Sequence, residues 1–102
     1  MKRVELLWFA GCPGHMPARA LLDEVIAAVA PGTPVESIDV SDPDVASAHR
    51  FPGSPTIRVD GQDVDPGYED AGDYTPRCRL YRTPEGLLSV PPREWIEAAL
   101  RP

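Results

Sequence analysis

Two cysteines, Cys12 and Cys78, are the side chains best suited to covalent chemistry in this chain of 102 residues. Cys12 lies in the segment G-C-P-G-H, between an apolar run that ends at Phe9 and a helical pattern that follows Gly14. A thiol at the start of a helix is exposed to solvent and to the positive end of the helix dipole, and both favour the reactive thiolate. We therefore expect Cys12 to be a nucleophile; the alternative is a small, buried hydrophobic side chain.

His15 follows Cys12 by three residues, which is the spacing of neighbours on a helix. As an imidazolium, His15 can stabilise a Cys12 thiolate, and as a neutral ring it can carry a proton. The alternative is a histidine that caps the helix or faces solvent in its first turn. Both interpretations of His15 remain open from the sequence.

Cys78 stands at the start of an expected strand, C-R-L-Y-R at residues 78–82. That end of the strand is expected to point away from Cys12, which favours a buried or loop-facing thiol. The alternative is a resolving cysteine that the long loop 61–77 brings near Cys12. A Cys12–Cys78 disulfide requires Cα atoms within about 7 Å of each other.

Metal binding is the less favoured use of these residues. Cys12, His15, His49 and Cys78 are a Cys2His2 set, but their spacing fits no compact zinc motif. We therefore predict no metal site and no cofactor. Capture of a soft metal or a mercurial by one or two thiols remains a related alternative, because thiolates are soft ligands.

Composition restricts the class of protein. The hydrophobic content of 42% suits a folded chain, and the length suits one domain over residues 1–102. The net charge of −6 argues against nucleic acid and anionic membranes as partners. No apolar run has the length of a membrane span, and the N-terminal residues lack a signal-peptide pattern, so we expect a cytoplasmic protein.

Hydrophobic periodicity and turn residues predict an α/β fold with a central mixed sheet of four strands and helices on both faces. The order is strand, helix, strand, short helix, strand, strand, helix. The expected strands are 1–9, 35–40, 56–59 and 78–82, and the expected helices are 16–30, part of 41–51, and 92–100. Asp60-Gly61 is a hairpin signal. The acidic stretch 60–73 is expected to be a solvated loop, and Trp8, Phe9 and Trp95 are expected to pack in the core.

Two local motifs and this element order resemble the thioredoxin and glutaredoxin superfamily over nearly the whole chain. The motif F-A-G-C-P-G-H at residues 9–15, followed by L-L-D-E-V at 21–25, is similar to the W-C-x-x-C turn and its helix. The motif G-S-P-T at 53–56 is similar to the turn that carries a cis-proline opposite the active cysteine. S-P-T-I-R-V-x-G and C-R-x-Y also resemble a small bacterial group of thioredoxin-like proteins, some of them selenoproteins and some labelled alkylmercury lyase.

The resemblance implies a thiol oxidoreductase in which Cys12 attacks a disulfide, a peroxide or a related electrophile. It implies that Pro13, Gly14, Ser54 and Pro55 contact the substrate. Pro55 is then the cis-proline, and the Ser54 backbone is exposed for pairing with an extended substrate. Phe51 is expected to line the cleft beside Pro55.

The sequence departs from the family pattern at His15, which stands where a dithiol enzyme has its second cysteine. A dithiol cycle through that position is therefore excluded. Either a low-molecular-weight thiol or redox partner protein resolves the Cys12 intermediate, or Cys78 does, or the protein is not a reductase. The alternative function is a non-catalytic binding module that holds a peptide or captures a thiophilic metal or organomercurial in the same cleft.

Overall fold

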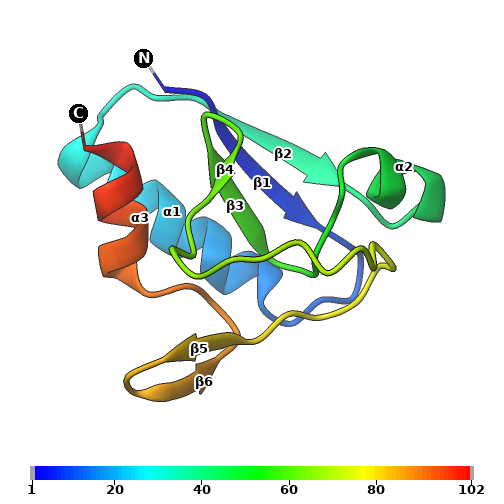
Figure 1. Cartoon of the computed structure of the whole chain (residues 1–102). Helices are drawn as coiled ribbons and strands as arrows, with labels where there is room; N and C mark the ends of the chain where they lie inside the picture. The colour runs from blue at the N-terminus through cyan, green and yellow to red at the C-terminus, as the bar shows by residue number, and fades with distance from the viewer. Residues whose placement is uncertain (1, 102) are drawn as a thin grey trace.

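The computed structural model describes residues 2–101, and it has an α/β fold with a four-stranded mixed sheet and three helices. The sheet strands are β1 (Val4–Trp8), β2 (Val35–Asp39), β3 (Thr56–Val59) and β4 (Gln62–Asp63), in the order β2-β1-β3-β4. β1 is parallel to β2 and antiparallel to β3, and β3 is antiparallel to β4. The helices are α1 (His15–Val29), α2 (Pro43–Ala48) and α3 (Arg93–Leu100). Figure 1 shows the elements in chain order.

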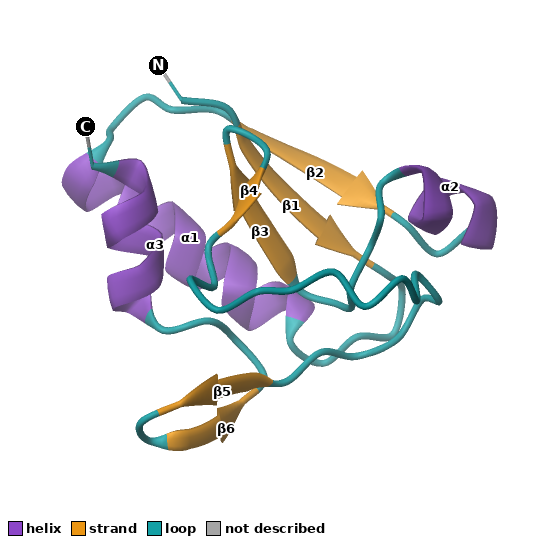
Figure 2. Cartoon of the chain, in the orientation of Figure 1, coloured by secondary structure: helices purple, strands orange, loops and turns teal. Residues whose placement is uncertain are grey.

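Helices cover both faces of the sheet, as the sequence predicted (Figure 2). Alternation along β1 explains this arrangement, because successive side chains of a strand point to opposite faces. Leu6 joins the larger core, which α1 and α3 supply with apolar side chains such as Leu22 and Ile96. Leu7 joins a second, smaller core on the α2 side, with Val40, Ala46 and Phe51. Phe51 is fully buried there, so the expectation that it lines the cleft is wrong.

Local sequence signals determine where several elements start and stop. The Asp42 side chain accepts a hydrogen bond from the Asp44 N–H at 2.8 Å, and Pro43 follows at the first position of α2. Asp60 and Gly61 both have positive φ, at 53° and 82°, as a two-residue hairpin turn requires. The hairpin signal is therefore confirmed, and it joins β3 to β4.

The fourth strand of the sheet was predicted in the wrong place. It is the short β4 that follows the hairpin, and residues 78–82 do not join the sheet. Instead, β5 (Tyr81–Thr83) and β6 (Gly86–Leu88) form a separate two-stranded hairpin, which lies away from the sheet in Figure 1. The alternating pattern of C-R-L-Y-R was consistent with a strand, but β4 already occupies the sheet edge beside β3.

Residues Arg77, Cys78 and Arg79, which we call the strap, run beside the turn before β3. The Ser54 N–H donates to the Arg77 carbonyl at 2.7 Å, and the Arg79 N–H donates to the Ser54 carbonyl at 2.8 Å. These two bonds form an isolated parallel bridge between Ser54 and Cys78. The strap is therefore fixed to the turn by its backbone.

The Arg79 side chain anchors the strap to the sheet. Its guanidinium lies 2.7 Å from the Asp63 carboxylate and donates to the Thr56 hydroxyl at 3.0 Å. Only 10% of the Arg79 side chain and 3% of the Asp63 side chain are exposed. The guanidinium also lies over the ring of Tyr81, 4.3 Å from its centroid. Asp63, expected in a solvated loop, is instead the buried counter-ion of the strap.

We expect Asp63→Asn to lower the free energy of unfolding by about 3 to 5 kcal/mol, because it leaves the buried Arg79 charge without its main counter-ion. Asp73→Asn is the matched control, since Asp73 pairs with Arg77 in an exposed i,i+4 bridge and such pairs contribute little. Urea unfolding followed by circular dichroism measures both variants. Equal stability of Asp63→Asn and wild type would contradict the anchoring role of Arg79.

Candidate functional site

The turn that carries Cys12 is built by backbone hydrogen bonds and one glycine. The Cys12 N–H donates to the Phe9 carbonyl at 3.3 Å, and the His15 N–H donates to the Cys12 carbonyl at 3.4 Å. Gly11 is the third residue of the turn Phe9–Cys12, and its φ of +89° suits that position of a type II turn. Cys12 is partly exposed, two residues before the N-cap of α1 at Gly14. The turn thus places the thiol at the start of α1, as the sequence predicted.

Gly14 brings this turn against Pro55, whose peptide bond with Ser54 is cis. A Cβ atom on Gly14 would lie 3.0 Å from Pro55 Cδ and 2.8 Å from the Ser89 carbonyl oxygen. No larger residue fits there without a shift of the backbone at Ser89. Gly14 and Pro55 are therefore packed against each other, and both are buried, while Pro13 is exposed.

Cys78 lies beside Cys12, contrary to the expectation that it points away. The strap bond to Ser54, next to Pro55, carries Cys78 to the same place as the Cys12 turn. Loss of hydration and the adjacent Cys12 thiol raise the pKa of Cys78 above its ordinary value of 9.0. The nearby Cys12 side chain contributes because a second negative charge beside it is unfavourable. Both thiols are free, and Cys78 is exposed.

The raised pKa of Cys78 assigns different tasks to the two thiols. At neutral pH Cys78 is protonated, so it is a poor attacking group until its proton leaves. A protonated thiol is a hydrogen-bond donor, and the Cys12 side chain is near enough to influence its titration. The raised pKa therefore makes Cys78 the less reactive thiol at neutral pH.

The His15 ring packs against Trp8, whereas the sequence suggested an imidazolium that stabilises the Cys12 thiolate. Its ring stacks on Trp8, with centroids 4.1 Å apart and planes 7° from parallel. Partial burial and the charge of Arg19 lower the pKa of His15, and Asp39 opposes the shift. The ring is therefore mostly neutral at pH 7, which suits a proton carrier better than a fixed positive charge. Its part in chemistry at Cys12 stays a prediction.

The Ser54 backbone is closed, which corrects the expectation that it is exposed for an extended substrate. Ser54 is 1% exposed, and both its N–H and its carbonyl are bonded to the strap. Its hydroxyl oxygen is buried without a hydrogen-bond partner among the described residues. The Pro55 carbonyl accepts a hydrogen bond from the buried Tyr81 hydroxyl.

Several residues that shape this site have no local sequence signal. Arg79, Asp63 and Tyr81 hold the strap and the Pro55 carbonyl, yet Asp63 is separated from the other two by the long loop after β4. The alternating polarity of residues 78–82 gave the opposite indication, because it groups Leu80 with Cys78 on the apolar face, whereas Leu80 is exposed and Tyr81 is buried. Their roles follow from contacts between segments that are distant in the sequence.

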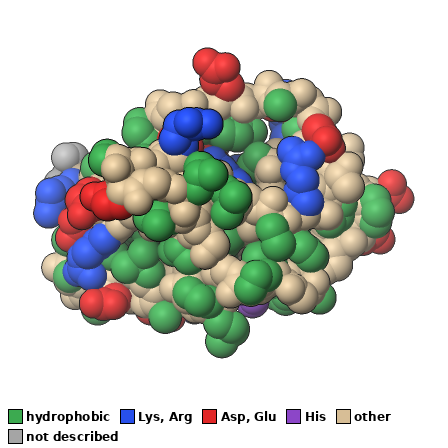
Figure 3. Space-filling model, turned by 90° about the horizontal axis from the view of Figure 1, so that it is seen from below, with side chains coloured by type: hydrophobic (Ala, Val, Ile, Leu, Met, Phe, Trp, Pro, Cys, Tyr) green, Lys and Arg blue, Asp and Glu red, His purple; other side chains and the backbone are tan. Residues whose placement is uncertain are grey.

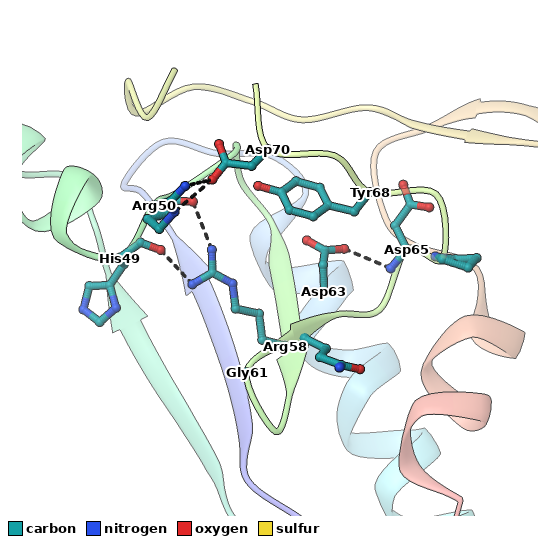
Figure 4. A pocket seen from close by; sticks show the side chains of 10 residues that line it. His49, Arg50, Arg58, Gly61, Asp63, Asp65, Tyr68 and Asp70 are labelled. Carbon is teal, nitrogen blue, oxygen red and sulfur yellow. Dashed lines mark hydrogen bonds and ion pairs between the residues drawn. The ribbon is translucent and has the colours of Figure 1, made fainter. Parts of the chain in front are cut away.

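A separate cavity of about 490 Å³ lies beside β3 and the loop that follows β4 (Figure 4). Its charged groups bond to one another or to the backbone: Arg50 pairs with Asp70, and Arg58 donates to the carbonyls of His49 and Arg50. Asp63, on its wall, is already paired with Arg79. Arg50 and Asp70 therefore neutralise each other, whereas the Arg58 guanidinium is held by backbone carbonyls and has no carboxylate partner among the described residues. Neither cysteine lines this cavity.

Apolar side chains are exposed around the strap and the hairpin. The large exposed ones are Met16, Leu80, Leu87 and Leu88. Figure 3 views the molecule from the hairpin side and shows hydrophobic side chains over much of this face. Leu80 follows the strap directly, so apolar surface borders Cys78.

No group of three or more histidine, cysteine or acidic side chains within residues 2–101 is arranged to hold a metal ion. Across the same residues, none of the helices combines the length and the apolar character needed to cross a bilayer. His49 lines the separate cavity and does not join the two cysteines.

Comparison with known proteins gives no relative: the chain matches no family model, no curated protein and no solved structure.

We expect Cys12→Ser to lower the pKa of Cys78 toward its ordinary value, because the variant removes the neighbouring thiol and its charge. Loss of hydration remains, so the shift is partial. The rate of Cys78 alkylation by iodoacetamide against pH, read from the mass of its peptide, measures this pKa. His15→Gln is the control and leaves the Cys78 profile in place. A Cys78 profile that is identical in Cys12→Ser and wild type would show that the two thiols are not in contact.

Proposed function

We propose that the chain is a thiol oxidoreductase with a thioredoxin-like fold, in which Cys12 attacks a disulfide and Cys78 resolves the intermediate. The observation that carries the proposal is the adjacency of two free, accessible thiols, one of which has a raised pKa. The sheet order β2-β1-β3-β4 and the packing of Gly14 on Pro55 support the thioredoxin-like assignment. The reducing cytoplasm, where free thiols persist, is the compartment that suits this chemistry.

The proposed reaction has two exchanges. The Cys12 thiolate attacks one sulfur of a disulfide R–S–S–R′, forms a Cys12–S–S–R bond and releases R′–S⁻. Cys78 then loses its proton to the departing thiolate or to solvent and attacks the Cys12 sulfur, which releases R–S⁻. The substrate disulfide gains two electrons and becomes two thiols, while Cys12 and Cys78 become a disulfide. A low-molecular-weight thiol or a redox partner protein returns the pair to its reduced form.

Cys78 replaces the second cysteine that the Cys12 turn lacks. In this arrangement position 15 does not need to carry a second thiol. The neutral His15 ring, stacked on Trp8, can accept or donate a proton. The proposal thus selects one of the three routes left open by the sequence. It also changes the expectation of a single active-site thiol into a pair of thiols from distant segments.

A second candidate function is binding without turnover. Two adjacent thiols also suit a soft metal ion, which binds thiolate sulfur, or an organomercurial, whose carbon-bound mercury accepts a thiolate in place of its other ligand. The exposure of Cys78 favours capture of such a ligand from solvent. This function predicts tight stoichiometric binding, with no release of thiols from a disulfide.

We expect the reduced wild-type protein to convert one equivalent of a chromogenic aromatic disulfide into two free aromatic thiols. The intact mass of the protein should then show no attached aromatic group. Cys78→Ser releases one thiol and retains a mixed disulfide on Cys12, because nothing resolves it. Cys12→Ser loses the rapid phase, since the protonated Cys78 attacks slowly at pH 7. Stopped-flow absorbance and intact mass spectrometry provide the two measurements.

The comparison of variants separates the alternatives. A wild-type protein that retains the adduct as Cys78→Ser does would show that an outside thiol resolves Cys12. A rapid phase that survives in Cys12→Ser would remove Cys12 as the attacking thiol. Release of no thiol by the wild type would favour the binding function.

A further inference from the structure

We infer that the strap restricts this site to low-molecular-weight disulfides, because it occupies the backbone edge that an extended polypeptide substrate would need. The inference rests on the proposed function and adds the class of substrate. An extended peptide binds beside a turn or strand by adding main-chain hydrogen bonds to a free edge. Such binding needs N–H and carbonyl groups that are not already bonded.

Every main-chain acceptor of the segment beside the thiols is occupied. The Gly53 carbonyl accepts from the Thr56 hydroxyl at 2.6 Å, the Ser54 carbonyl from Arg79 N–H, and the Pro55 carbonyl from the Tyr81 hydroxyl. Ser54 N–H is bonded to the strap, and Pro55 has no N–H to donate. Ser54 and Pro55, the residues of the turn beside the thiols, therefore keep no free main-chain group with which a second chain could pair.

The strap also fits too closely to leave room for another chain. A Cβ atom on Gly53 would lie 2.7 Å from Arg79 Cβ, so the two backbones approach as closely as a glycine permits. The buried pairing of Arg79 with Asp63 resists displacement, because lifting the strap separates two charges with little exposure. A substrate polypeptide would have to break this pairing before it gained any hydrogen bond.

The sulfur atoms themselves stay accessible. Cys12 is partly exposed and Cys78 is exposed, so a small disulfide can reach them from solvent. The substrate is therefore recognised at its sulfur atoms and their immediate substituents, with no contribution from a flanking peptide backbone. In the same structure, one segment supplies the resolving thiol and excludes extended substrates.

The test compares two substrates that have the same chemistry at sulfur. One is the disulfide of N-acetylcysteine amide, and the other is the disulfide of an unstructured peptide with three extra residues on each side of that cysteine. Stopped-flow absorbance measures the rate at which the wild-type protein reduces each substrate, and the ratio of the longer substrate's rate to the shorter one's is compared. We expect the longer substrate to react no faster than the shorter one. A longer substrate that reacts about tenfold faster or more, as two added backbone hydrogen bonds allow, would overturn the inference.

The outcomes distinguish this inference from the proposed function. If the two substrates react and the longer one is much faster, only the substrate class is wrong. If neither substrate reacts, the proposed function fails and the inference fails with it.

A variant pair tests whether the strap is the cause. Gly53→Ala places a methyl group against Arg79 and should push the strap away, so that the longer peptide gains rate relative to the shorter one. Gly72→Ala is the control, because Gly72 also has positive φ, at +79°, but its Cβ would meet nothing within 4 Å. If Gly53→Ala folds and still gives the wild-type ratio of the two rates, the strap is not what excludes the longer peptide. The wild-type comparison decides the substrate class even if Gly53→Ala does not fold.

Discussion

Two backbone hydrogen bonds between Ser54 and the strap determine how the two cysteines meet. Cys78 is 66 positions beyond Cys12 in the sequence, and no helix or sheet strand carries it there. The Ser54–strap bridge fixes Cys78 beside the turn, and Gly14 fixes the Cys12 turn against Pro55 from the other side. Holding two reactive groups in place in this way makes their reaction effectively intramolecular, which is a large advantage over reaction with a dissolved thiol.

The buried pair of Arg79 and Asp63 explains why this bridge can persist without a sheet around it. A single bridge of two hydrogen bonds contributes little net stability, since water competes for the same groups. Arg79 adds a charge-assisted contact to β4, a bond to the first residue of β3 and a ring contact with Tyr81. Stability of the strap and position of the thiol therefore depend on the same side chain.

Much of the fold could be predicted from the sequence, because its signals are local. The alternation of Leu6 and Leu7, the Asp60-Gly61 turn and the Gly-rich start of α1 each specify a structure within a few residues. The position of Cys78 could not be predicted in this way. It depends on Arg79 reaching Asp63 and on Tyr81 reaching the Pro55 carbonyl, and neither contact leaves a pattern in its own segment. The strand expected at residues 78–82 was placed in the sheet because the actual fourth strand, β4, has only two residues and leaves no periodic pattern.

His15 shows how a correct motif can suggest an incomplete mechanism. Its spacing from Cys12 is that of an activating neighbour, yet its ring stacks on the Trp8 ring. The neighbouring thiol comes from Cys78, after the long loop 61–77, a position that the sequence offered only as the less favoured alternative. The candidate site is therefore a thiol pair built across the fold, in place of a dithiol motif within one turn.

The most direct test of this account is the equilibrium between the reduced chain and its Cys12–Cys78 disulfide in glutathione redox buffers, measured for the native protein and again in concentrated urea. Peptide mapping of the trapped thiols gives the oxidised fraction in each case. The account predicts that the native protein keeps the disulfide in far more reducing buffer than the unfolded chain does, because the fold holds the two thiols together. Equal oxidation of the native and unfolded chains would contradict it.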